Sequence, residues 1–117
     1  MRSDGRSHPR ARLDDNFASA IRFSLMASLE EDLELDFATL GEILDVGDSA
    51  LSKAISHLNA AGYVTARRGQ VGSRPRTWVR ATMMGVSAFA RHLDALQAIV
   101  EFGHGTATGE REKPAAR

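Results

Sequence analysis

Hydrophobic residues recur at helical spacing in residues 16–32, "NFASAIRFSLMASLEED", and they lie on two sides of the predicted helix. One stripe is Phe17, Ile21, Leu25 and Leu29, and the other is Phe23 and Met26. A helix that is apolar on two sides packs one side into its own core and leaves the other for a further contact. We therefore expect Phe17 and Ile21 to contribute to an interface with a partner.

Two further helices follow in close succession. Residues 36–47, "DFATLGEILDVG", place apolar side chains on one face behind Asp36, which is a good capping residue. Residues 48–62, "DSALSKAISHLNAAG", repeat the pattern behind Asp48, and their buried stripe is Leu51, Ala54, Ile55 and Leu58. The short "DVGD" between the two gives the spacing of a helix-turn-helix motif.

The pattern then changes from helix to strand. Residues 63–68, "YVTARR", and 76–81, "RTWVRA", are rich in β-branched and aromatic side chains, which favour strands. The segment between them, "GQVGSRP", holds two glycines and a proline. We expect a β-hairpin with a long tip, placed directly behind the second helix of the helix-turn-helix, and we expect Trp78 to be a half-buried packing residue.

A long helix closes the folded part of the chain. After Thr82, a possible cap, apolar residues alternate at intervals of three and four: Val86, Phe89, Leu93, Leu96 and Val100. This heptad spacing is typical of a helix that packs along another helix. We expect Phe89, Leu93, Leu96 and Val100 to form the dimer interface together with the first helix.

The ends of the chain lack the apolar residues needed for a core. We expect residues 1–12 to be a disordered basic arm, residues 13–102 to form the folded domain, and residues 103–117 to be a disordered tail. The fold class predicted from the whole pattern is mainly α with a small β-hairpin wing, a winged helix-turn-helix whose terminal helices form a dimer interface.

Composition narrows the class of protein. The chain has 117 residues, 43% of them hydrophobic, which suits one small domain that gains from burying surface against a second subunit. There is no cysteine, so disulfides and thiolate metal sites are excluded. The basic start is not followed by an apolar run, and no stretch approaches the ~18 apolar residues of a membrane span. We expect a cytoplasmic protein.

The charge is zero in total, from 15 basic and 15 acidic residues, but it is unevenly distributed. Residues 13–48 carry ten acids and one arginine, whereas residues 49–80 carry one lysine and five arginines with no acid. Such asymmetry indicates contact with nucleic acid, with a solvated basic face as the alternative. We interpret the acidic run at residues 30–36 as a solvated turn. Because alternate strand residues share a face, we expect some of Arg67, Arg68 and Arg80 to point toward that run.

Several short motifs, in this order, resemble the winged-helix transcriptional regulators of the MarR and ArsR groups, in particular a compact single-domain subgroup. They are Leu51-Ser52-Lys53, the join from Leu58 through Gly62-Tyr63-Val64, the wing sequence Arg74-Pro75-Arg76-Thr77, and Thr82-x-x-Gly85. The resemblance spans roughly residues 13–100. It implies a homodimer that binds DNA, with terminal helices at the dimer interface.

Two sets of residues are candidates for DNA contact. The first set lies off the buried stripe of the helix at residues 48–62, where it would meet base edges in the major groove: Ser49, Ser52, Lys53, Ser56 and His57. The second set is Arg74 and Arg76, which flank Pro75, because arginine suits a narrow minor groove or a phosphate.

No arrangement of residues indicates catalysis, a metal site, a cofactor or a particular small-molecule effector, so we do not expect an enzyme. The predicted function is sequence-specific binding of double-stranded DNA by a homodimeric transcriptional regulator, with repression as the expected mode. Two alternatives stay open at this point: a winged-helix module that binds a protein partner, and a protein that binds structured RNA by its shape.

Overall fold

The computed structural model describes residues 7–29 and 33–115, with the side chains of these residues as far as residue 105. Its elements in chain order are η1 (Pro9–Arg12), η2 (Asp15–Phe17), α1 (Ala20–Ser28), β1 (Glu34–Asp36), α2 (Phe37–Leu44), α3 (Asp48–Ala60), β2 (Val64–Val71), β3 (Arg74–Ala81) and α4 (Met83–Ala115). The chain divides into two compact units, one of Asp14–Phe89 and one that joins the residues up to Leu13 with those from Ala90 onward. The predicted fold class, mainly α with a hairpin wing, is confirmed.

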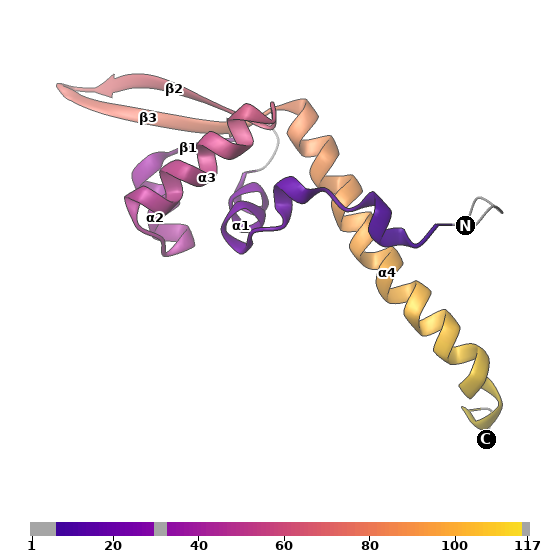
Figure 1. Ribbon diagram of the computed structural model, residues 1–117. Helices are drawn as coiled ribbons and strands as arrows, with labels where there is room; N and C mark the ends of the chain where they lie inside the picture. The colour runs from indigo at the N-terminus through magenta and orange to yellow at the C-terminus, as the bar shows by residue number, and fades with distance from the viewer. Residues whose placement is uncertain (1–6, 30–32, 116–117) are drawn as a thin grey trace. The chain divides into compact units, whose positions relative to one another are not determined.

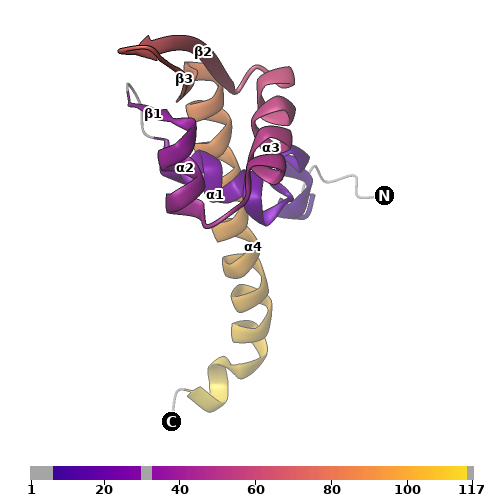
Figure 2. The same ribbon diagram turned by 90° about the vertical axis from the view of Figure 1, so that its left-hand side faces the viewer.

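The unit Asp14–Phe89 is a three-stranded antiparallel sheet with helices packed on one side. The strand order is β1-β3-β2, so β3 is the central strand. Both views show α1, α2 and α3 on the same side of the sheet, with the hairpin of β2 and β3 extending beyond them (Figure 1 and Figure 2). The core between these layers contains the largest fully buried side chains: Leu25, Leu40, Leu51, Leu58, Val64 and Val79.

Helix α3 begins and ends at defined residues. Its N-cap is Gly47, whereas the sequence pattern predicted Asp48; Asp48 is instead in the first turn, where a carboxylate interacts favourably with the helix dipole. At the other end, the Tyr63 N–H donates to the Leu58 carbonyl at 2.9 Å and the Gly62 N–H donates to that of Asn59 at 2.9 Å. This is a Schellman motif, and it directs the chain from α3 into β2.

The hairpin has a tight turn and not the long tip that the sequence predicted. Strand pairing continues to Val71 and Arg74, which leaves residues 72–73 as a two-residue turn. Gly72 has a φ of +66°, and glycine at the first central position is what one type of two-residue hairpin turn prefers. Pro75 is tolerated within β3 because β1 pairs with that strand only farther along, at residues 78–80.

Part of the acidic run is a strand, which corrects its interpretation as a solvated turn. Residues 34–36 form β1, in which Glu34 pairs with Arg80 and Asp36 pairs with Trp78 across the ladder to β3. The physical reason is that the acids face arginines of the sheet, so pairing offsets the low strand propensity of acidic residues. Residues 30–32 of the run lie outside the described residues.

Helix α4 starts against the join between α3 and β2. The Thr82 Oγ1 accepts a hydrogen bond from the Gly85 N–H at 2.9 Å and donates one to the Gly62 carbonyl at 2.7 Å, so Thr82 caps the helix as predicted. A Cβ at Gly85 would lie 2.1 Å from the Tyr63 carbonyl oxygen. The close approach of the two backbones therefore requires glycine at this position.

The second unit contains η1 and the later part of α4. Within it the His8 and Phe102 rings lie 4.7 Å apart, and Pro9, His92 and Ala95 are buried. The sequence predicted disorder from residue 103, but α4 continues to Ala115. Extending an existing helix adds one hydrogen bond per residue, which costs far less than starting a new one.

The predicted disorder of the N-terminal arm concerns residues 1–12. Of these, η1 gives a regular structure to Pro9–Arg12, and residues 1–6 lie outside the described residues, as do 116–117.

Within residues 7–29 and 33–115, none of the helices combines the length and apolar character needed to cross a membrane.

Candidate nucleic-acid interface

The polar face of α3 forms a shallow hollow that is open to solvent. Its volume is about 580 Å³, and it is lined by Ser49, Ser52, Lys53, Ser56 and His57. All five side chains are exposed, while Leu51, Ala54, Ile55 and Leu58 on the opposite side of the helix are buried. The structure thus brings together all five α3 residues that the sequence singled out, on a helix held by its other face.

A second hollow, of about 310 Å³, lies beside the first, between the start of α1 and α3. It is lined by Ser19, Ile21, Arg22, Ala50, Lys53, Ala54 and His57. The Arg22 guanidinium is held by backbone carbonyls: Nε donates to Asn16 at 2.8 Å and Nη2 donates to Asp15 at 3.4 Å. Because Lys53 and His57 line both hollows, the cationic surface extends from α3 toward α1.

Ser19 and Arg22 are two polar residues of this surface that the sequence reasoning missed. Ser19 caps α1, since its Oγ accepts a hydrogen bond from the Arg22 N–H at 3.2 Å. Two signals were available. A serine before an apolar-periodic stretch is a helix start, and Arg22 is the single basic residue within the acidic segment 13–48.

The outer face of the sheet, turned away from the core, carries a clamp across its three strands. Arg67 of β2 donates two hydrogen bonds to Glu34 of β1, Nε to Oε2 and Nη2 to Oε1, each at 2.9 Å. Its guanidinium lies 5.6 Å from the centre of the Trp78 ring on the intervening strand β3. The hydrogen bonds between Arg67 and Glu34 are the largest cause that lowers the pKa of Glu34 and raises that of Arg67. Burial opposes both shifts, and the attraction between the two charges adds to them. Arg67 therefore holds the three strands together and points toward the acidic run, as we expected of some of the strand arginines. Trp78 is half-buried, as predicted.

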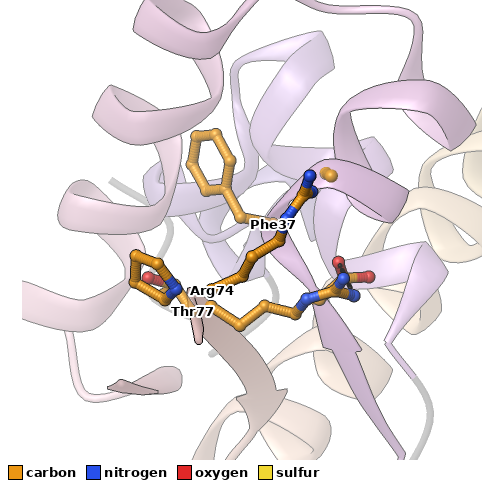
Figure 3. Close-up of a pocket in the computed structure, with 7 residues that line it drawn as sticks. Phe37, Arg74 and Thr77 are labelled. Atoms are coloured by element: carbon orange, nitrogen blue, oxygen red, sulfur yellow. Dashed lines mark hydrogen bonds and ion pairs between the residues drawn. The ribbon is translucent and has the colours of Figure 1, made fainter. Parts of the chain in front are cut away.

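A second ion pair fixes β3 to the start of α2. The Arg76 Nη1 lies 3.1 Å from Asp36 Oδ2, and Asp36 is only 7% exposed. Hydrogen bonding from Thr39 is the largest cause that lowers the pKa of Asp36; burial opposes it, and the charge of Arg76 lowers the pKa further. The pair borders a cavity of about 330 Å³ between β3 and α2, where Figure 3 shows Phe37, Arg74 and Thr77.

The two arginines predicted to contact DNA are thus in different states. Arg76 is engaged with Asp36, and its side chain is 37% exposed. Arg74 is exposed and belongs to the last residue pair before the turn. Among the described residues, Arg74 has no ion-pair partner. Within the part of the chain that the structure describes, the tip of the wing therefore offers the unpaired guanidinium of Arg74.

The residues predicted for a dimer interface divide in a similar way. Phe17 is 3% exposed, and its ring lies 5.4 Å from that of Tyr63 and 5.1 Å from that of Phe89. Phe17 is therefore a core residue, and its prediction as a dimer contact is corrected, because a side chain already buried in one subunit has almost no surface left for a second. Ile21 and Phe89 are half-buried. Along α4, Leu93, Leu96 and Val100 are 42%, 37% and 49% exposed.

Comparison with known proteins places this geometry in a family. A family model described as a winged helix DNA-binding domain matches residues 21–100. The chain belongs to this family. The matched range of the winged helix domain includes the five polar residues of α3 and both Arg74 and Arg76. No curated protein matches the chain.

Solved structures agree with the winged helix assignment. The chain resembles the transcriptional regulator homologue protein from Pyrococcus horikoshii OT3, with 25% identity and a TM-score of 0.69 over 75% of this chain and 87% of that one. It resembles the YusO protein from Bacillus subtilis with 18% identity and a TM-score of 0.71, over 93% and 77% of the two chains. A MarR-family transcriptional regulator from Silicibacter pomeroyi follows with 24% identity and a TM-score of 0.56, over 92% and 75%.

The last two likenesses concern the fold alone, because their identities are low. Together with the family match, they confirm the resemblance to MarR-like winged-helix regulators that the wing and helix motifs indicated. They support a transcriptional regulator with a DNA-binding domain, since the proteins from Pyrococcus horikoshii and Silicibacter pomeroyi are named as transcriptional regulators.

Proposed function

We propose that the protein is a homodimeric transcriptional repressor that binds double-stranded DNA sequence-specifically. The observation that carries this proposal is the hollow of about 580 Å³ on α3, which gathers Ser49, Ser52, Lys53, Ser56 and His57 on the exposed side of a helix whose other side is fixed in the core. In winged-helix and helix-turn-helix proteins such a helix enters the major groove and reads base edges.

The chemistry of this face suits DNA better than a protein partner. Short hydroxyl groups bond to bases or phosphates at close range, and Lys53 reaches guanine acceptors or a phosphate. The centre of a protein–protein interface is usually enriched in aromatic residues and poor in lysine. None of the five residues that line the α3 hollow is apolar, and none is tyrosine, tryptophan or phenylalanine.

The wing supplies a second, less selective contact. Arg74 is free to enter a minor groove or to pair with a phosphate, and the tight turn at residues 72–73 places it near the end of the hairpin. Arg76 was also predicted to contact DNA, but its guanidinium is already engaged in an ion pair with Asp36. We assign Arg74 the DNA contact and Arg76 the task of orienting the wing.

Dimerisation rests on the exposed apolar residues of α4. Leu93, Leu96 and Val100 lie three and four residues apart, so they share one stripe of the helix, and each is exposed in the single chain. A second copy can bury this stripe against its own. A two-fold dimer then presents two α3 helices to two half-sites of an operator.

Titration with DNA tests the central claim. Sequences are selected from a random duplex pool, and the affinity for the selected and for a random duplex is measured at several salt concentrations. If each subunit neutralises three or four phosphates, log affinity falls with log salt with a slope of about −5 to −7 for the dimer. Equal affinity for both duplexes would contradict sequence-specific binding, and stronger competition by an RNA duplex than by DNA would favour the RNA alternative.

Light scattering tests the dimer. The isolated protein is expected to have the mass of two chains at micromolar concentration. Leu93→Asp should shift it toward a monomer because it places a carboxylate in the stripe without a partner. Ser87→Asp is the matched control, since it adds the same charge at an exposed position of α4 that lies off the stripe. A wild-type monomer, or equal loss of mass in both variants, would contradict the interface.

Repression is tested on the selected sequence. A transcription template that carries this sequence over its promoter should yield less transcript as the protein is added, while a template with a scrambled site should be unaffected. A rise in transcript from the first template would show an activator instead.

A further inference from the structure

A chain of hydrogen bonds links α3 and the start of the strand that follows it to the segment before α1. The Tyr63 hydroxyl donates to Asp14 Oδ2 at 2.5 Å. The backbone N–H and the side-chain Nδ2 of Asn16 both donate to Asp14 Oδ1, at 2.9 and 3.0 Å. The His57 Nε2 lies 3.0 Å from Asn16 Oδ1. All four residues belong to the unit Asp14–Phe89.

The direction of each bond follows from the chemistry of its donor and acceptor. Both oxygens of Asp14 act as acceptors, one for the Tyr63 hydroxyl and one for the Asn16 backbone N–H. The Asn16 side chain must therefore turn its amide nitrogen toward Asp14, which directs its carbonyl oxygen at His57. A carbonyl oxygen only accepts, so the His57 Nε2 has to carry the hydrogen.

This arrangement fixes the form of the neutral imidazole. When Nε2 of a neutral histidine carries the hydrogen, Nδ1 is a hydrogen-bond acceptor. No residue in the described part of the chain supplies a hydrogen-bond donor to the His57 Nδ1. The side chain is exposed, and with Lys53 it lines both hollows of the candidate interface.

An acceptor on this face discriminates between bases. In the major groove, adenine and cytosine present exocyclic amino groups, which are donors, whereas guanine presents only acceptors and thymine an acceptor and a methyl group. A phosphate is also an acceptor only and gains nothing from a neutral Nδ1. The ring that Asn16 orients thus matches an amino group and mismatches the other groups within reach.

We propose that His57 is a specificity-determining residue that accepts a hydrogen bond from the exocyclic amino group of an adenine or cytosine, and that Asn16 is a positioning residue that sets the tautomer of His57. The proposal rests on the proposed function, because it requires α3 to lie in the major groove. It adds that one base of each half-site is read by a residue whose hydrogen-bonding character is set by the segment preceding α1.

The tautomer is measured first, on the free protein and without DNA. Long-range proton–nitrogen NMR correlations on protein with isotope-labelled histidine, at a pH where the ring is neutral, distinguish the nitrogen that carries hydrogen from the one that does not. The Nε2–H form is expected to dominate at His57 in the wild type. Asn16→Ala should move His57 toward a mixture of both forms, whereas Tyr63→Phe, which keeps the Asn16 carbonyl in place, should leave the dominant form unchanged.

Two results of that measurement would overturn the positioning role. One is an Nδ1–H form in the wild type, and the other is a folded Asn16→Ala protein with an unchanged ring. If Asn16→Ala does not fold, the wild-type spectrum still decides which nitrogen carries the hydrogen, and Asn16→Ser serves as the second variant.

The base contact is measured on the selected duplex with analogues of adenine and cytosine that lack the amino group. At one position per half-site, removal of the amino group should weaken wild-type binding about three- to tenfold, the range of one hydrogen bond. The same analogue should not change the DNA affinity of the His57→Ala protein, because this variant lacks the imidazole that accepts the hydrogen bond. Ser56→Ala is the control, and it should respond to the analogue as the wild type does.

The outcomes separate this proposal from the proposed function. If His57→Ala weakens selected and random duplexes equally, His57 contacts a phosphate, and its role in specificity is overturned while DNA binding stands. If His57→Ala and the wild type respond equally to every analogue, the amino-group contact is overturned. If the wild type binds no duplex, both proposals fail on DNA, while the tautomer measurement still judges the link between Asn16 and His57.

Discussion

The α3 face and the outer face of the sheet both carry many polar and charged residues, but they differ in how many of those residues are already engaged. On α3, the side chains of Ser49, Ser52, Lys53 and Ser56 make no hydrogen bond or ion pair within the described part of the chain, and only His57 is tied to a neighbour. On the sheet, Arg67 and Arg76 are bound to the acids of β1, and among the arginines of that face within the described residues Arg74 is the unpaired one.

The comparison shows that a count of charges does not measure the charge available to a ligand. The five arginines of residues 67–80 suggest a strongly basic wing. A strand of three residues, β1, neutralises two of them and turns them into fasteners of the sheet. We therefore assign sequence-selective DNA binding to the α3 face, most of whose polar groups are unpaired. The wing contributes mainly the charge of Arg74.

The largest effect should come from removing the support of the α3 face. Leu51→Ala deletes a fully buried side chain behind the hollow and should lower the free energy of unfolding by about 2–5 kcal/mol. Val71→Ala is the matched change on the wing, where the side chain is 49% exposed, and it should cost less than about 0.5 kcal/mol. Urea unfolding of both variants measures the difference, and similar losses would show that the wing is packed as tightly as α3.

A smaller effect is expected on the sequence specificity of DNA binding when Lys53 is replaced. Lys53→Ala removes an unpaired cation from the α3 face and should weaken binding to the selected duplex by about 1–3 kcal/mol more than binding to a random duplex. Titrations on the two duplexes give both numbers. Equal weakening of both would reassign Lys53 to a phosphate, and sequence would then be read by the serines or His57.

The two wing arginines should separate in one experiment. Arg74→Ala should weaken selected and random duplexes together, by about 1 kcal/mol or more, and should make the salt slope shallower by about one unit for each phosphate that the dimer no longer neutralises. Arg76→Ala should mainly lower the midpoint of thermal unfolding, because it leaves the buried carboxylate of Asp36 without the cation that pairs with it. If Arg76→Ala instead changes the salt slope as much as Arg74→Ala and leaves stability intact, Arg76 contacts DNA and its link to Asp36 is incidental.

The contrast between the α3 face and the sheet also explains which features of the structure could be predicted from the sequence. The helix α3 and its exposed residues were predictable because Leu51, Ala54, Ile55 and Leu58 give a clear helical period, and the opposite face follows from it. β1 was not predictable, since three residues show no period and acids disfavour strands. The engagement of Arg76 depends on the register of β1 against β3, which no local pattern encodes.

Phe17 shows a further limit of the pattern. Its place in the stripe signalled burial correctly, but the same apolar spacing arises whether a side chain packs in its own core or against a second copy. The aromatic cluster with Tyr63 and Phe89 that buries it is formed by residues far apart in the chain. Hydrophobic periodicity predicts that a residue is buried and does not say by what.

The smallest effect concerns acid, and it tests whether the ion pairs of β1 fasten the wing through their charge. The pKa of Asp36 and that of Glu34 are lowered in the folded protein, so the unfolded chain binds protons more readily. Their contribution to stability is therefore fully present above their ordinary pKa values of 3.8 and 4.5 and is lost as the pH falls through the lower folded values. Asp36→Asn and Glu34→Gln should each be less stable than the wild type at about pH 7, and the difference should shrink progressively as the pH falls below the ordinary pKa of each carboxyl group and through its lowered folded value. Urea unfolding across this range measures it, with Lys53→Ala as a control from α3, whose difference from the wild type should not follow the same course. A gap between Asp36→Asn and the wild type that stays constant down to the lowest pH would mean that Asp36 fastens the wing by its shape and neutral hydrogen bonds, and that the sheet is held together without the charge of its acids.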